Sequence, residues 1–135
     1  MSRTIILDRH RFPVEVTLNG RCIAYTRRAL RLEEPGYPAR FYVPREDVDM
    51  GNLERTSRVT RCPFKGEAAY YTVLVDGETE VSAAWTYEQP VEGMESIRDH
   101  ICFDDSGAIE VDGEAGGRPS RTADLRQFPT APSPR

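Results

Sequence analysis

Two dipeptides, Asn19-Gly20 and Asp76-Gly77, each lie between segments in which apolar and polar residues alternate. Asn-Gly and Asp-Gly are the preferred residues of two-residue β-turns, because both central positions of such a turn need positive φ. Alternation with a period of two is typical of β-strands. The sequence therefore predicts two antiparallel hairpins, one over residues 14–26 and one over residues 68–87.

The Asp76-Gly77 turn also predicts which residues face each other in the second hairpin. If the register is uninterrupted, three cross-strand pairs follow: Tyr70 with Ala83, Thr72 with Val81, and Ala68 with Trp85. The face that carries these side chains is the more apolar one, so it is expected to be buried. The opposite face is expected to meet water, and it carries Glu78, Glu80, Ser82 and Thr86 beside Tyr71 and Val73.

The remaining elements are shorter. Strands are expected at 29–32, 39–43, 57–60, 101–103 and 108–111, with a loop at 51–56 and short helical segments at 45–48 and 92–100. No glycine-rich loop joins a strand to a long helix, which argues against a Rossmann or P-loop fold. The chain is therefore predicted to be mainly β, a single antiparallel domain with one or two short helices.

A length of 135 residues favours one domain. We divide it into an N-terminal segment (1–12), a β domain (13–112) and a tail (113–135). The tail is rich in glycine, proline, serine and arginine and has no periodicity, so it is predicted to be disordered.

The cysteine pattern and the absence of a long apolar run indicate the cellular compartment of the protein. Cys22, Cys62 and Cys102 are widely spaced and odd in number, which argues against a disulfide framework and fits a reducing compartment. No apolar run approaches the length of a membrane span, and the short apolar stretch near the N-terminus does not form a secretory signal. A cytoplasmic protein without a membrane partner is expected.

Charge is distributed unevenly along the chain. Residues 1–61 hold 12 arginines against 8 acids, whereas residues 62–112 hold 2 basic residues against 12 acids. Two interpretations remain open: solvated faces of opposite sign, or a basic face that receives an anionic ligand. No run of basic residues appears, which argues against nucleic-acid binding.

The segment TRCPFKGEAAYY (60–71) contains Lys65, the one lysine among 18 lysines and arginines. Pro63 and Gly66 shape this segment into a loop that presents side chains. Lys65 is a candidate catalytic residue as an anion or carbonyl partner, and Cys62 as a nucleophile or redox thiol. The alternatives are a structural hydrogen bond for Lys65 and a small buried apolar side chain for Cys62.

Several aromatic residues have polar tips that need partners when they are buried. Together with nearby charged residues they are typical of a small-ligand site. The candidate ligand-binding residues are Arg40, Tyr42, Glu67, Tyr70, Trp85 and Tyr87. The spacing of cysteines and histidines predicts no metal site, and no cofactor is expected.

Three runs, ARFYVPREDVDM (39–50), TRCPFKGEAAYY (60–71) and AAWTYEQP (83–90), followed by HICF (100–103), resemble the domain-of-unknown-function family 427. That family also carries a nucleotidyltransferase-like label, without an established activity. The resemblance implies a β-rich fold of the Mss4-like, β-tent kind. The family pattern falls on Tyr42, Pro44, Asp47 and Val48, then on Thr60, Cys62, Pro63, Lys65, Gly66, Ala68 and Tyr70, and finally on Ala84, Trp85, Tyr87 and Pro90. The paired-cysteine knuckles of zinc-binding β-tent relatives are absent here.

The expected function is therefore the binding of an unidentified small molecule, with an anion favoured, by a loop built around Cys62 and Lys65. A non-catalytic protein-interaction or structural module is the first alternative. Nucleotidyltransferase-like activity, as the family label suggests, is the second. Two carboxylates that could hold Mg²⁺, Asp47 and Asp49, are two positions apart in an expected helical turn, where their side chains diverge.

Overall fold

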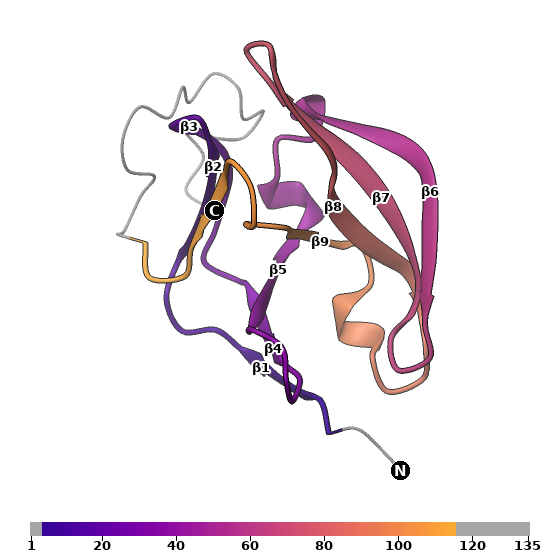
Figure 1. Ribbon diagram of the computed structural model, residues 1–135. Helices are drawn as coiled ribbons and strands as arrows, with labels where there is room; N and C mark the ends of the chain where they lie inside the picture. Colours follow the sequence, from indigo (N-terminus) through magenta and orange to yellow (C-terminus); the bar gives the residue numbers. More distant parts are fainter. Residues whose placement is uncertain (1–3, 116–135) are drawn as a thin grey trace.

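The computed structural model describes residues 4–115, so the predicted tail lies outside the described residues except for its first three positions. Two antiparallel sheets make up this part of the chain (Figure 1). Its ten strands are β1 (Ile6–Arg9), β2 (Val14–Leu18), β3 (Arg21–Thr26), β4 (Leu30–Glu33), β5 (Arg40–Pro44), β6 (Leu53–Cys62), β7 (Gly66–Val75), β8 (Glu78–Pro90), β9 (His100–Phe103) and β10 (Ile109–Asp112). The mainly β prediction is confirmed.

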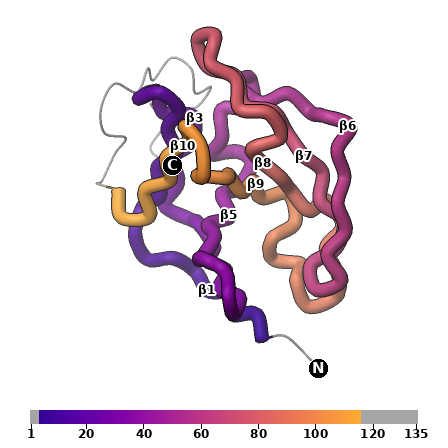
Figure 2. Tube along the Cα trace, viewed as in Figure 1, coloured from indigo at the N-terminus to yellow at the C-terminus, as the bar shows by residue number. Residues whose placement is uncertain are grey.

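The larger sheet has seven strands in the order β1-β4-β5-β9-β8-β7-β6, and the smaller has the order β10-β2-β3. Strand β9 lies between β5 and β8 and thereby joins the N-terminal strands to the long β6–β7–β8 meander (Figure 2). Since β9 comes from a distant part of the sequence, this junction depends on long-range pairing. The candidate site lies at the junction.

One face of the large sheet packs on the small sheet. The small sheet contributes Val14, Val16 and Leu18 from β2, which are almost completely buried. Val73 of β7 and Ile101 of β9 meet them from the large sheet. This is the first of two hydrophobic cores, and it holds the two sheets together by removing apolar surface from water.

The other face of the large sheet carries a second core. Its buried members are Leu32, Tyr42, Ala68, Tyr87, Met94, Ile97 and Cys102. Met94 and Ile97 come from the segment that follows β8, where Met94 directly precedes the short 3₁₀ helix η3 (Glu95–Ile97) and Ile97 is its last residue. The large sheet is therefore covered on both faces.

Coverage of both faces overturns one sequence-based expectation. Tyr71, Val73 and Thr86, predicted to meet water, are buried. Val81, predicted to be buried, is 75% exposed. Alternating apolar and polar residues predict a sheet with one solvent-exposed face. Here the small sheet covers the face that this alternation assigned to solvent.

Both predicted two-residue turns are present, with positive φ at Asn19, Gly20, Asp76 and Gly77. Next to the second turn the register is as predicted, with Val75 opposite Glu78.

Farther from that turn, the register of the β7–β8 hairpin changes, and the three predicted cross-strand pairs are wrong. Val73 still pairs with Glu80, but Tyr71 pairs with Ala84, so β8 carries two extra residues between these pairs. Ser82 lies in this bulge with φ 51°, and its N–H donates to Thr72 Oγ1 at 3.1 Å. The bulge brings Trp85 opposite Tyr70 and Tyr87 opposite Ala68.

Helical structure in residues 4–115 is limited to 3₁₀ turns: η1 (Arg45–Asp47), η2 (Met50–Asn52) and η3. The helix expected over 92–100 is reduced to η3, because Gly93 and Asp99 adopt positive φ and interrupt it on either side. The loop expected at 51–56 is largely part of β6, and β1 adds a strand that the sequence did not predict. No described helix is long and apolar enough to cross a membrane.

Candidate functional site

A row of side chains crosses four neighbouring strands on the face that holds the second core. Tyr42 of β5 pairs with Cys102 of β9, Cys102 pairs with Trp85 of β8, and Trp85 pairs with Tyr70 of β7. Directly opposed residues point to the same face of a sheet. Three of the predicted ligand-binding residues, Tyr42, Tyr70 and Trp85, therefore lie in one continuous row.

Arg40 and Tyr87 flank this row on the same face, because each lies two positions from a member of it on its own strand. The Arg40 guanidinium carbon lies 5.2 Å from the centre of the Trp85 ring, in a cation–π contact. The Tyr42 and Tyr87 rings are 6.4 Å apart. Five of the six predicted ligand-binding residues are thus brought together.

The polar tips of the row are hydrogen-bonded. Trp85 Nε1 donates to the Tyr42 hydroxyl at 3.4 Å, and the Tyr70 hydroxyl lies 2.9 Å from Thr60 Oγ1. Burial raises the pKa of Tyr42, and burial is also the main cause of the raised pKa of Tyr87, with the nearby Cys62 adding to it. Both buried tyrosines therefore remain protonated, as hydrogen-bond donors, at neutral pH.

The predicted loop around Cys62 and Lys65 is the hairpin turn between β6 and β7. Cys62 pairs with Gly66, and the Lys65 N–H donates to the Cys62 carbonyl at 3.2 Å. The Lys65 carbonyl accepts from the Val91 N–H at 3.0 Å. Gly66 has φ 122°, and a Cβ there would lie 3.1 Å from the Gln89 carbonyl oxygen. Glycine is needed at this position because the turn lies directly against the chain that leaves β8.

Lys65 forms a buried ion pair with a residue that the sequence did not single out. Its Nζ lies 3.2 Å from Glu34 Oε1, with the two side chains only 13% and 7% exposed. Glu34 begins the turn between β4 and β5, so the pair joins two hairpin turns that come from opposite halves of the large sheet. Lys65 Nζ also lies 6.0 Å from the centre of the Tyr87 ring.

Cys102, at the centre of the row, is fully buried. Burial raises its pKa to about 12, while the positive charges of Arg40 and Lys65 act in the opposite direction. Cys62 is only half-buried.

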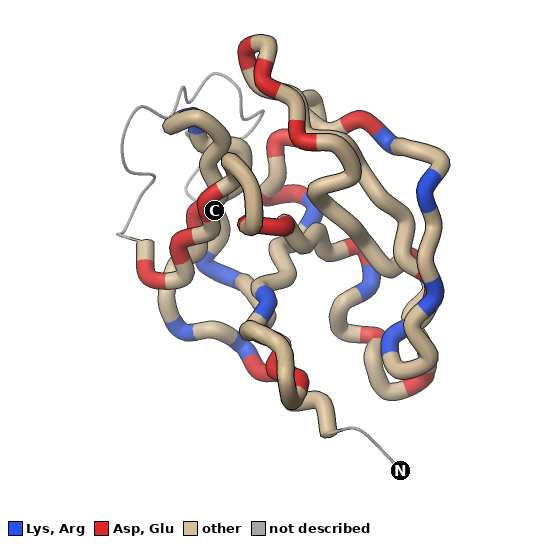
Figure 3. Tube along the Cα trace, in the orientation of Figure 1, with Lys and Arg blue, Asp and Glu red and all other residues tan. Residues whose placement is uncertain are grey.

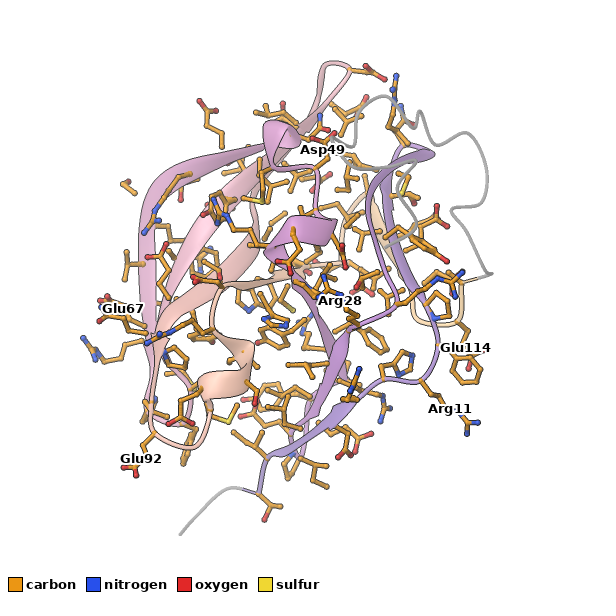
Figure 4. All side chains as sticks on the ribbon, turned by 180° about the vertical axis from the view of Figure 1, so that it is seen from behind. Arg11, Arg28, Asp49, Glu67, Glu92 and Glu114 are labelled. Carbon is orange, nitrogen blue, oxygen red and sulfur yellow. The ribbon has the colours of Figure 1, made fainter. Side chains whose placement is uncertain are left out.

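Glu67 is the one predicted ligand-binding residue that does not reach the site. It lies 3.7 Å from Arg61, and the two side chains are 59% and 76% exposed. Figure 4 shows Glu67 on the outer edge of the sheet. Residue 67 belongs to the opposite alternation of β7 from Tyr70, so its side chain points to the other face.

Three residues at the site were missed by sequence reasoning: Glu34, Cys102 and Arg58. Arg58 lies in the irregular part of β6, with its guanidinium carbon 4.5 Å from the centre of the Tyr70 ring. Arginines recur along β6, whereas acidic residues gather on the β7–β8 turn and along β10 (Figure 3). This recurrence of arginine in a strand was the signal that could have identified Arg58.

The acids considered for Mg²⁺ have structural partners. Asp47 Oδ2 accepts from Thr26 Oγ1 at 2.7 Å, and Asp49 Oδ1 accepts from the Gly51 N–H at 3.2 Å. Within residues 4–115, no three histidine, cysteine, aspartate or glutamate side chains are grouped so that they could hold a metal ion.

No curated protein matches the chain. A family model described as a domain of unknown function (DUF427) matches residues 6–116, a span that includes both sheets and every residue of the row. The chain belongs to the DUF427 family.

Proposed function

We propose that this domain binds a small anionic molecule on the face formed by Tyr42, Trp85 and Tyr70, with Arg40 as the principal partner of the anion. The main observation behind the proposal is how the Arg40 guanidinium is placed. Its guanidinium contacts the Trp85 ring, and the nearest carboxylate within residues 4–115, that of Asp105, is 4.0 Å away. That separation is too long for a hydrogen bond.

A cation–π contact leaves the N–H groups of a guanidinium available as hydrogen-bond donors. Those N–H groups match the geometry of a carboxylate or phosphate, which they bind with two parallel hydrogen bonds. Arg40 is therefore positioned by Trp85 before any ligand arrives. Preorganisation of this kind lowers the entropy cost of binding.

Lys65 has a different place in this proposal. Its charge is already balanced by Glu34 at 3.2 Å, so it does not add net positive charge to the site. We assign it the role of a positioning residue that holds the β6–β7 turn against the β4–β5 turn. With Asp47 and Asp49 engaged by Thr26 and Gly51, the arrangement favours binding over nucleotidyl transfer.

The fluorescence of Trp85, the single tryptophan, reports directly on this site. We would titrate the protein with citrate, inorganic phosphate and benzoate, and repeat each titration with Arg40→Gln. Loss of a bidentate charged partner should weaken binding by about tenfold or more. Arg61→Gln is the matched control, because Arg61 is exposed and lies outside the row. Unchanged affinity in Arg40→Gln, or no response to any probe, would refute the proposal.

Two broader proposals accompany this one. The packing of a three-stranded sheet against a larger curved sheet supports an Mss4-like, β-tent fold, which superposition of an experimental structure on Mss4-like domains would test.

The three free thiols support a cytoplasmic location. Cell fractionation tests the location, and recovery outside the cytoplasmic fraction would contradict it.

A further inference from the structure

We infer that the ligand is a planar aromatic anion, whose ring lies against Trp85 and Tyr70 and whose acidic group is held by Arg40 or Arg58. This inference rests on the proposed function and narrows it from anions in general to flat ones. It follows from three features of the site: a partly exposed ring pair, two guanidinium groups over those rings, and the local balance of charge.

Trp85 and Tyr70 form a pair of rings that is accessible from solvent. Their centres are 6.1 Å apart, and the planes are inclined by 43°. Both residues are partly exposed, whereas Tyr42 and Tyr87 on the same face are buried. Tyrosine and tryptophan that remain partly open offer a large flat apolar surface, and such surfaces bind other rings.

Each ring of the pair carries one guanidinium. Arg40 lies over Trp85 at 5.2 Å and Arg58 lies over Tyr70 at 4.5 Å. A guanidinium is itself planar and has two faces. The Arg40 side chain is 31% exposed, so its N–H groups can reach the acidic group of a ligand whose ring lies beside it against Trp85 and Tyr70. An aliphatic ring of the same size is puckered and cannot stack in this way.

The charge balance determines the sign of the ligand. Lys65 is neutralised at short range by Glu34, but among residues 4–115 Arg40 has only the 4.0 Å contact with Asp105. Arg58 makes no ion pair with a carboxylate among residues 4–115. The ring pair is therefore flanked by two cations without close neutralising partners. The acidic group they would hold is a carboxylate or a phosphate, since both accept from guanidinium.

Two matched ligand pairs test the inference by Trp85 fluorescence. Benzoate and cyclohexanecarboxylate share a carboxylate and differ in planarity, and AMP and ribose 5-phosphate share a phosphate and differ by the aromatic base. The aromatic member should bind about tenfold more tightly in at least one pair, the effect of one stacking contact. The pair that shows the difference identifies the acidic group.

Variants at Tyr70 separate the ring from its hydroxyl group. Tyr70→Leu should abolish the advantage of the aromatic member, whereas Tyr70→Phe should keep it, because the ring remains. If Tyr70→Leu fails to fold by circular dichroism, Tyr70→Met takes its place and should abolish the same advantage, because it also lacks the ring. An advantage that persists unchanged in the folded variant would overturn the inference.

The outcomes distinguish this inference from the proposed function. If both members of each pair bind equally and lose affinity in Arg40→Gln, the planar ligand is refuted while anion binding stands. If none of the four compounds binds at concentrations up to about 10 mM, which corresponds to a binding free energy weaker than about 3 kcal/mol, and citrate and inorganic phosphate do not bind either, both proposals fail.

Discussion

Replacing Lys65 by methionine removes one charge of the buried ion pair while keeping most of the side chain's length. At 3.2 Å, with an effective dielectric constant near 20, the attraction between Lys65 and Glu34 is about 5 kcal/mol. Both groups lose hydration on folding, which offsets part of that attraction. What remains in the variant is a carboxylate with 7% exposure facing an apolar side chain. Loss of one partner of a buried pair costs about 3 kcal/mol of unfolding free energy.

Urea unfolding, followed by Trp85 fluorescence and by far-ultraviolet circular dichroism, measures this cost. The double variant Lys65→Met/Glu34→Gln removes both charges and should lie within about 1 kcal/mol of the wild type. Arg61→Met is the control from the same hairpin, because its 3.7 Å pair with Glu67 is exposed and should contribute well under about 1 kcal/mol.

Comparing Lys65→Met with Arg61→Met tests whether the ion pair with Glu34 stabilises the fold. If Lys65→Met costs no more than Arg61→Met, the ion pair with Glu34 does not hold the two turns together. If the double variant is as unstable as the single one, the loss comes from packing around residue 65 and not from the lost charge balance of the pair.

Three further predictions concern the backbone, the thiols and a buried hydroxyl. Gly66→Ala should lower the unfolding free energy by about 2 kcal/mol, measured by urea unfolding, because the new methyl group meets backbone at 3.1 Å; an unchanged midpoint would contradict this. Burial raises the pKa of Cys22 and Cys102 to about 12, so both stay protonated near pH 8, and mass spectrometry should find iodoacetamide on half-buried Cys62 first. Earlier modification of either buried thiol would refute that order. Thr86→Val removes a 2.7 Å donor to a main-chain carbonyl and should cost about 1.5 kcal/mol in the same unfolding assay, whereas a cost near zero would show that water replaces the hydroxyl.

Much of the site could be predicted because side chains alternate along a strand whatever lies around it. Tyr70, Trp85 and Tyr87 were assigned to one face of the hairpin, and they do share it. The same rule places Glu67 on the other face, so alternation alone contradicts its prediction as a site residue. The turns were predictable for an equally local reason, the positive φ that Asn-Gly and Asp-Gly accept.

What could not be predicted depends on contacts between distant segments. Glu34 is 31 positions from Lys65, and no periodicity connects the two. Cys102 joins the row only because β9 inserts between β5 and β8. The burial of Tyr71 is decided by the small sheet, whose strands come from both ends of the described chain. Local pattern determines which way a side chain points, but the rest of the fold determines what it meets.

The two-residue bulge around Ser82 has a consequence for changes in chain length. Because β8 carries two extra residues there, every side chain beyond the bulge keeps the face that strict alternation would assign it, and only its partner changes. Deleting two of the residues 81–83 would therefore remove the bulge and leave Trp85 opposite Tyr70 on the same face. Deleting a single residue would, under strict alternation, turn the Trp85 side chain toward the other core and remove it from the row. Strand β8 should therefore tolerate a deletion of two residues better than a deletion of one residue.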